Sequence, residues 1–216
     1  MRKLAFRWLA VGLACGLALA ACGSFIAARP WKAGNETAAQ REFLGRLSDA
    51  AIERTTHVVR YDGAYVRIQY PGGDVPADTG VCTDEVIRAY RALGIDLQKD
   101  VHEDMEAHFS AYPNHSRWML AHTDTNIDHR RVPNLRIFFE RRGENLTITA
   151  SAADYVPGEL VTWDLGGGVG HIGIVVDRKA PSGRFMVVHN IGAGPKMEDV
   201  LFARSITGHY RYFGTR

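Results

Sequence analysis

The chain has little cysteine, no strong excess of either charge, and no long apolar run after its first 21 residues. Three cysteines in 216 residues are too few for a disulfide-rich scaffold. The 26 lysines and arginines nearly balance the 24 aspartates and glutamates, which argues against a basic surface for nucleic acid. The apolar fraction of 46% and the charged fraction of 23% are those of an ordinary globular domain.

The first 21 residues have the pattern of an export signal. Three basic residues stand within the first seven, and the apolar run 8–21 follows them, which is the order in secretory signal peptides. The run ends in Leu-Ala-Ala-Cys at 19–22, which resembles the lipobox of bacterial lipoproteins. That resemblance implies a lipid anchor on Cys22; the alternative is ordinary cleavage after Ala21.

We therefore expect an exported protein held at a membrane surface in the periplasm. Gly23-Ser24 lacks the acidic residue associated with retention in the inner membrane, so we expect the outer membrane. Residues 22–35 resemble a tether before a single domain at 36–216. Without the signal, 23 basic residues stand against 24 acidic ones, and the mature charge is close to −1.

Cys82 is the one cysteine left for the folded domain, because Cys15 and Cys22 belong to the export signal and its edge. A lone thiol cannot form an internal disulfide, and it is either a small buried hydrophobe or a reactive group.

Apolar periodicity and turn residues predict an α+β domain in which helices pack on a small antiparallel sheet. The predicted helices cover 36–55, 82–93, 99–110 and 133–142, with Gly94 ending the second. The predicted strands cover 64–70, 160–164, 171–177, 184–190 and 208–213.

The position of Cys82 favours thiol chemistry. It opens a predicted helix, where unpaired backbone N–H groups carry positive partial charge and favour a thiolate. The same groups can stabilise the oxyanion of a tetrahedral intermediate. His171 begins an apolar strand after a glycine loop and is the candidate base; the alternative is a strand-end histidine satisfied locally. Either His189 or Asn190 can orient His171, but not both, because side chains alternate along a strand.

Three motifs in the expected order resemble the NlpC-type cell-wall cysteine peptidases, which have a papain-like fold. They are YPGGDVPADTGVCTDEVIRAYRALG at 70–94, PGELVTWDLGGGVGHIGIVVD at 157–177 and RFMVVHN at 184–190. Residues 45–213 resemble, more narrowly, the bacterial domain of unknown function 1287. The resemblance implies that Cys82 is the nucleophile, His171 the base and His189 the orienting residue.

The resemblance also implies that Tyr70 lies near the oxyanion site. Val81 and Thr83 stand where the peptidases usually have aspartate and serine, so the bond that is cut stays open.

Two further candidates lie outside these positions. Trp163 either lines the cleft or belongs to the core. His129, with Arg130, either binds a substrate carboxylate or lies on a solvated basic loop. The His102 and Glu106 pair does not match the zinc motif, and we expect no metal and no cofactor.

Three hypotheses follow. The leading one is a monomeric thiol hydrolase that cleaves an amide bond, with peptidoglycan peptides as substrate. The second is an acyltransferase with the same nucleophile. The third is a lipid-anchored, non-catalytic murein-binding module.

Overall fold

The computed structural model describes residues 36–215 of the chain. The expected signal peptide, Cys22 and the expected tether lie outside these residues. No helix within the described range is both long enough and apolar enough to cross a membrane.

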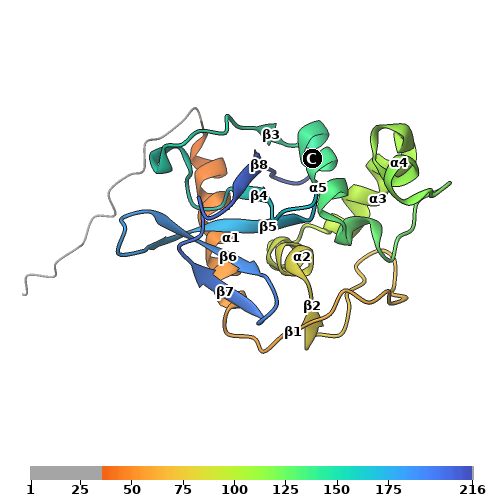
Figure 1. Cartoon of the computed structure of the whole chain (residues 1–216), viewed down its shortest axis with the longest axis horizontal. Helices are drawn as coiled ribbons and strands as arrows, with labels where there is room; N and C mark the ends of the chain where they lie inside the picture. The colour runs from red at the N-terminus through yellow and green to blue at the C-terminus, as the bar shows by residue number, and fades with distance from the viewer. Residues whose placement is uncertain (1–35, 216) are drawn as a thin grey trace, which may run out of the picture. The chain divides into compact units, whose positions relative to one another are not determined.

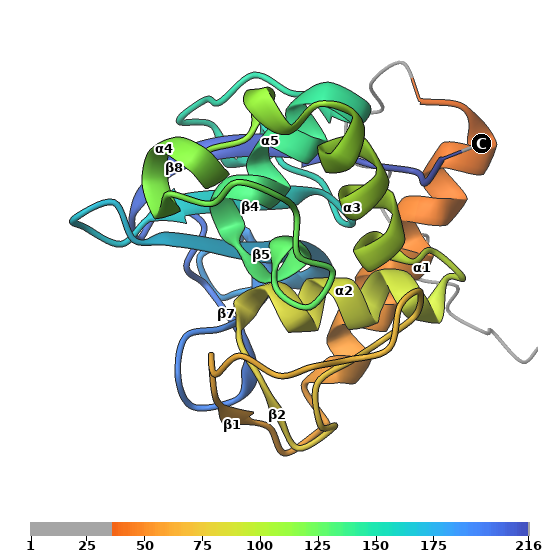
Figure 2. The same cartoon turned by 90° about the vertical axis from the view of Figure 1, so that its right-hand side faces the viewer.

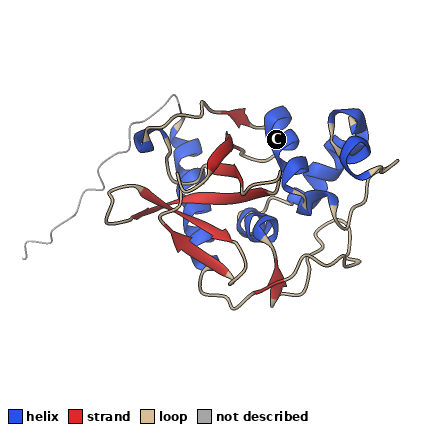
Figure 3. Ribbon diagram, in the orientation of Figure 1, coloured by secondary structure: helices blue, strands red, loops and turns tan. Residues whose placement is uncertain are grey.

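A six-stranded antiparallel sheet forms the centre of the domain (Figures 1 and 3). Its strand order is β3-β8-β4-β5-β6-β7. The strands are β3 Glu144–Asn145, β4 Leu160–Asp164, β5 Gly170–Lys179, β6 Phe185–Asn190, β7 Pro195–Glu198 and β8 Ser205–Arg211. A separate parallel pair joins β1 Arg60–Tyr61 to β2 Thr79–Gly80.

Five α-helices and three short 3₁₀ helices complete the described part. The α-helices are α1 Ala38–Arg54, α2 Cys82–Ala92, α3 Leu97–Ala107, α4 Asn114–Trp118 and α5 Val132–Arg142. The 3₁₀ helices are η1 Phe109–Ala111, η2 Asp128–Arg130 and η3 Ala152–Asp154. Helices α1 and α2 pack against each other and against β5 (Figure 2).

Strand β5 is apolar on both faces because both faces are covered. Ile172, Ile174 and Val176 belong to the core cluster that includes α2, and Val175 belongs to a second cluster with Trp163. A strand buried on both sides has a nearly continuous apolar sequence. The predicted α+β class, with helices packed on an antiparallel sheet, is confirmed.

Most predicted elements lie within three residues of their observed bounds. Strand β4 matches the predicted 160–164, and α2 matches 82–93 to within one residue. Gly94 follows α2 with φ +81°, the left-handed conformation that ends many helices.

The predicted strand at 64–70 is wrong. These residues alternate as a strand would, but most are exposed and no strand pairs with them. The Ile68 N–H instead donates to Oδ1 of Asn126 at 2.9 Å. Strand β7 shows the opposite error. It is a strand in the structure, but its four residues Pro-Lys-Met-Glu do not have the pattern of one, and no strand was predicted there.

Gly173 provides a test of the tight contact between β5 and β6. A Cβ at this position would lie 2.7 Å from Cγ1 of Val187 and 3.1 Å from Cβ of His189. We expect Gly173→Ala to lower the free energy of unfolding by about 1–3 kcal/mol through overpacking. Urea denaturation measures this change.

Gly45→Ala is the matched control. Gly45 lies inside α1, and a Cβ there would meet nothing within 4 Å. This substitution should raise stability by up to about 1 kcal/mol. Equal destabilisation by both variants would show that the contact with β6 is not tight.

Candidate active site

Cys82 is the first residue of α2, and only 5% of its surface is exposed. Burial is the main influence on its thiol and raises the pKa of Cys82 to about 12, with Asp84 adding to the rise. The backbone N–H groups of Ile172 and Thr83 act in the opposite direction by hydrogen bonding to the sulfur. The free protein therefore holds Cys82 as a neutral thiol at pH 7.

An ion pair holds the start of α2. The Asp84 carboxylate accepts a hydrogen bond from the Val81 N–H at 2.7 Å. It also accepts two from the Arg130 guanidinium, at 2.8 and 3.0 Å, and both side chains are 2% exposed. A bidentate arginine–carboxylate pair fixes geometry as well as charge. Thr83 Oγ1 donates to the Arg130 carbonyl at 3.0 Å, so α2 and η2 are joined twice.

His171 and His189 meet across neighbouring strands. Nε2 of His171 lies 2.8 Å from Nδ1 of His189, and both residues are 4% exposed. The register that pairs Ile174 with Val188 makes the two histidines diagonal neighbours on one face. Their rings form an edge-on contact with centroids 5.1 Å apart. The sequence left either His189 or Asn190 to orient His171, and the structure brings His189 to it.

A residue that the sequence analysis missed follows in the same chain of hydrogen bonds. Nε2 of His189 lies 3.0 Å from Oε2 of Glu198 on β7. Glu198 stands nine residues after His189, across a glycine turn. This spacing fits a hairpin, but the strand signal that would have placed Glu198 beside His189 was absent.

Burial also sets the protonation of the two histidines. It lowers the pKa of His171 to about 4, and the proximity of His189 adds to the effect. The pKa of His189 is lowered by burial too, although Glu198 opposes the shift. Both imidazoles are therefore neutral at pH 7.

Cys82 and His171 line two separate cavities. The first has a volume of about 220 Å³ and is lined by Tyr61, Gly63, Val81, Cys82, Ile127, Arg130, Val132, Pro133 and Gly170. The second has a volume of about 180 Å³ and is lined by Trp163, Leu165, His171, His189, Ile191, Glu198, Val200, Ala203 and Arg204. Gly170 lines the first cavity and His171, the next residue of β5, lines the second.

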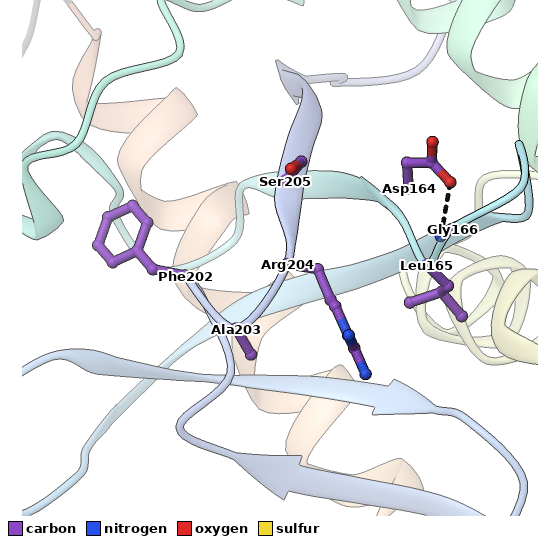
Figure 4. Close-up of a pocket in the computed structure, with 7 residues that line it drawn as sticks. All are labelled: Asp164, Leu165, Gly166, Phe202, Ala203, Arg204 and Ser205. Carbon is purple, nitrogen blue, oxygen red and sulfur yellow. Dashed lines mark hydrogen bonds between the residues drawn. The ribbon is translucent and has the colours of Figure 1, made fainter.

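A larger, open cavity of about 530 Å³ shares three lining residues with the histidine cavity. The shared residues are Leu165, Ala203 and Arg204. Figure 4 shows this cavity with Phe202 at one end and Asp164 at the other. Oδ1 of Asp164 accepts a hydrogen bond from the Gly166 N–H at 2.8 Å.

The expected position of Tyr70 near the oxyanion site is wrong. Its ring packs edge-on against His102 at 4.9 Å, and carboxylates on and before α3 surround it. Tyr70 is not among the residues that line the Cys82 cavity, and Gly73, which follows it, accepts a hydrogen bond from Arg91 in the last turn of α2 at 2.8 Å. Tyr61 on β1 lines the cysteine cavity instead, and burial together with the nearby Cys82 and Asp84 raises the pKa of Tyr61.

The prediction that His129 lies on a solvated basic loop is wrong. His129 is 3% exposed, so it does not lie on a solvated loop. Burial and the neighbouring Arg130 lower its pKa to about 3. Arg130 does bind a carboxylate, but that carboxylate belongs to Asp84 of this chain.

Trp163 and Asn190 each donate a side-chain hydrogen bond to a backbone carbonyl near the site. Trp163 is 2% exposed and donates from Nε1 to the Leu201 carbonyl at 2.9 Å, yet its ring lies 5.8 Å from that of His171. It is a core residue that also lines the histidine cavity. Asn190 donates to the Gly80 carbonyl at 3.4 Å and so supports the loop before Cys82.

Within residues 36–215, no group of three or more His, Cys, Asp or Glu side chains is arranged to hold a metal ion.

A family model described as "Domain of unknown function (DUF1287)" matches residues 48–212. The chain belongs to this family. It is 49% identical over 167 residues to "Uncharacterized protein YijF" of Escherichia coli (strain K12), covering 77% of this chain and 80% of that protein.

Two solved structures are also similar to the chain. They are NlpC2 and NlpC1 of Trichomonas vaginalis, with TM-scores of 0.44 and 0.43 and identities of 16% and 17%. Each match covers 87% of this chain, but the chain spans only about half of either structure, 51% and 49%.

The buried thiol predicts a distinctive labelling profile. Because only the thiolate reacts with iodoacetamide, folded Cys82 should label more slowly at pH 8 than the same residue in the urea-unfolded chain. Its rate should keep rising beyond pH 9. Mass spectrometry of the peptide that contains Cys82 measures the rate without interference from other cysteines. A plateau below pH 8 would contradict the neutral thiol.

His171 should also make stability depend on pH. Its folded pKa of about 4 lies below the ordinary 6.5, so its stabilising contribution is present above pH 6.5 and is lost as the pH falls toward 4. We expect His171→Gln to reduce the loss of unfolding free energy between pH 7 and pH 4.5 by on the order of 1–2 kcal/mol. The exposed His57 provides the control His57→Gln, which should leave the wild-type slope unchanged.

Proposed function

We propose that this protein is a thiol-dependent hydrolase of amide bonds, with Cys82 as nucleophile, His171 as base and His189 as the residue that orients the base. The observation that carries the proposal is the 2.8 Å contact between the two imidazoles. It lies at the start of β5, where the next residue, Ile172, presents its N–H to the Cys82 sulfur. The contact occupies Nε2 of His171 and leaves Nδ1 as the nitrogen that can accept a proton.

The first half of the reaction starts from a neutral thiol and a neutral imidazole. As the Cys82 sulfur attacks the carbonyl carbon, its proton passes to Nδ1 of His171. The tetrahedral oxyanion accepts hydrogen bonds from N–H groups in the first turn of α2. The Tyr61 hydroxyl lines the same cavity and is a second candidate donor. Breaking the C–N bond releases an amine, which takes the proton from His171, and leaves a thioester on Cys82.

Water completes the cycle. His171 Nδ1 takes a proton from the attacking water, the thioester carbon gains a hydroxyl, and the sulfur leaves and recovers the proton. The products are a carboxylic acid and the regenerated thiol. No redox change takes place, so the balance needs no co-reactant besides water.

Peptidoglycan peptide is the substrate that we propose. Its support is the likeness of 70–94, 157–177 and 184–190 to cell-wall peptidases, together with the expected export signal and lipid anchor at Cys22. The two cavities are lined by consecutive residues of β5, Gly170 and His171, and in this proposal an extended peptide occupies both.

Digestion of purified murein tests the proposal. The wild-type chain should release soluble peptides that mass spectrometry identifies, and Cys82→Ala should release none. His171→Gln should lower the rate by about 10²–10⁴-fold, the usual contribution of a positioned general base. His57→Gln is the matched control and should retain the wild-type rate.

The same assay separates the two rival hypotheses. If added amines appear in the products at the expense of free acid, the protein is an acyltransferase. If wild type and Cys82→Ala bind murein equally and neither cleaves it, the protein is a binding module and the hydrolase proposal is wrong. Cleavage that survives in Cys82→Ala would exclude the cysteine mechanism.

A further inference from the structure

Glu198 contacts the catalytic pair from the edge of the sheet. It lies on β7, the last strand in the sheet order, and the register pairs Glu198 with Val187 and Lys196 with His189. Glu198 and His189 are therefore diagonal neighbours on one face. Its carboxylate lies 3.0 Å from Nε2 of His189, and the Glu198 side chain is 41% exposed while that of His189 is 4% exposed.

The hydrogen bonds among Glu198, His189 and His171 determine which ring nitrogen carries the proton in each imidazole. An ionised carboxylate only accepts hydrogen bonds, so the proton of neutral His189 must be on Nε2, the nitrogen that faces Glu198. Nδ1 of His189 then has only a lone pair. The contact of 2.8 Å with His171 consequently requires the proton on Nε2 of His171. The remaining nitrogen, Nδ1 of His171, is left as an acceptor.

We propose that Glu198 is a positioning residue that fixes both imidazoles in the tautomer in which His171 Nδ1 can accept the Cys82 proton. The proposal deepens the hydrolase function and rests on it. Without the carboxylate, neutral His189 can equally hold its proton on Nδ1. The contact between the histidines then reverses, and Nδ1 of His171 carries a hydrogen instead of a lone pair.

Other charged groups near the pair do not replace this role. Lys196 opposes Glu198 by lowering the pKa of His189. Arg204 lines the same cavity, but a guanidinium only donates hydrogen bonds and cannot accept the proton on Nε2. The neighbouring Asp199 is engaged in a bidentate pair with Arg184, at 2.9 Å for both bonds. Among the described residues, Glu198 is the carboxylate within hydrogen-bond distance of His189.

Nitrogen NMR of the full chain tests the tautomers directly. Long-range ¹H–¹⁵N spectra distinguish a protonated imidazole nitrogen from an unprotonated one. In the wild type we expect Nε2 to be protonated, and Nδ1 to be unprotonated, in both His171 and His189. In Glu198→Ala the signals of both histidines should move toward a mixture of tautomers. Glu198→Asp, which keeps a carboxylate, should restore part of the wild-type pattern.

Kinetics provide the second measurement. Glu198→Ala should lower kcat by about 10–100-fold, the range seen when the partner of a functional imidazole is removed, with little change in KM. Glu53→Ala is the matched control, because Glu53 in the last turn of α1 also pairs with the Nε2 of a histidine, His57, at 2.6 Å, and lines neither cavity. It should leave both the kinetics and the signals of His171 and His189 unchanged. Because the Glu198 side chain is 41% exposed, we expect Glu198→Ala to fold normally. Thermal denaturation of the variant checks that the loss of kcat does not come from unfolding.

The outcomes separate this proposal from the hydrolase function. Unchanged tautomers in Glu198→Ala would overturn the role of Glu198 whatever the activity. Changed tautomers with unchanged kcat would overturn its contribution to catalysis. Changed tautomers in a protein whose wild type cleaves no amide bond would support the role of Glu198 at the histidines and overturn the hydrolase function.

Discussion

The placement of the first turn of α2 against β5 is the constraint on which the rest of the site depends. It buries Cys82 and brings the N–H of Ile172 to its sulfur. The surrounding polar contacts maintain this placement. The buried pair of Asp84 and Arg130 fixes the turn, and Asn190 holds the loop before it through the Gly80 carbonyl. Removing one partner of such a pair leaves an uncompensated buried charge, so the turn is difficult to move without disrupting the fold.

Burial and the helix N-terminus act on the thiol in opposite directions, and burial dominates. The N–H groups of a first helical turn favour a thiolate, yet the pKa of Cys82 rises to about 12. The pKa of His171 falls for the same reason. The resting protein therefore holds Cys82 as a neutral thiol and His171 as a neutral imidazole. In the proposed mechanism such a site depends on a correctly oriented lone pair more than on stored charge, and the tautomer of His171 therefore matters.

The sequence was sufficient to predict the elements that carry Cys82 and His171, the proposed nucleophile and base. Cys82 at a helix start and His171 at the start of an apolar strand are local patterns, and local patterns survive folding. The error at Tyr70 has a physical origin, because an alternating segment becomes a strand only if another strand pairs with it. Glu198 was missed because its strand cannot be recognised from its own four residues. Strand β7 is defined by its pairing with β6, and Pro-Lys-Met-Glu has little intrinsic preference for a strand.

The partial exposure of Glu198 suits a site that has to stay neutral. A fully buried carboxylate beside His189 would strongly favour an imidazolium, because charges interact more strongly where water is excluded. Solvent weakens the field of a carboxylate that is 41% exposed, and the pKa of His189 stays below its ordinary value despite the contact. The hydrogen bond, in contrast, depends on direction and distance, and solvent on the far side of the carboxylate does not remove it. An edge-strand glutamate can thus select the tautomer of two buried histidines while leaving both of them uncharged.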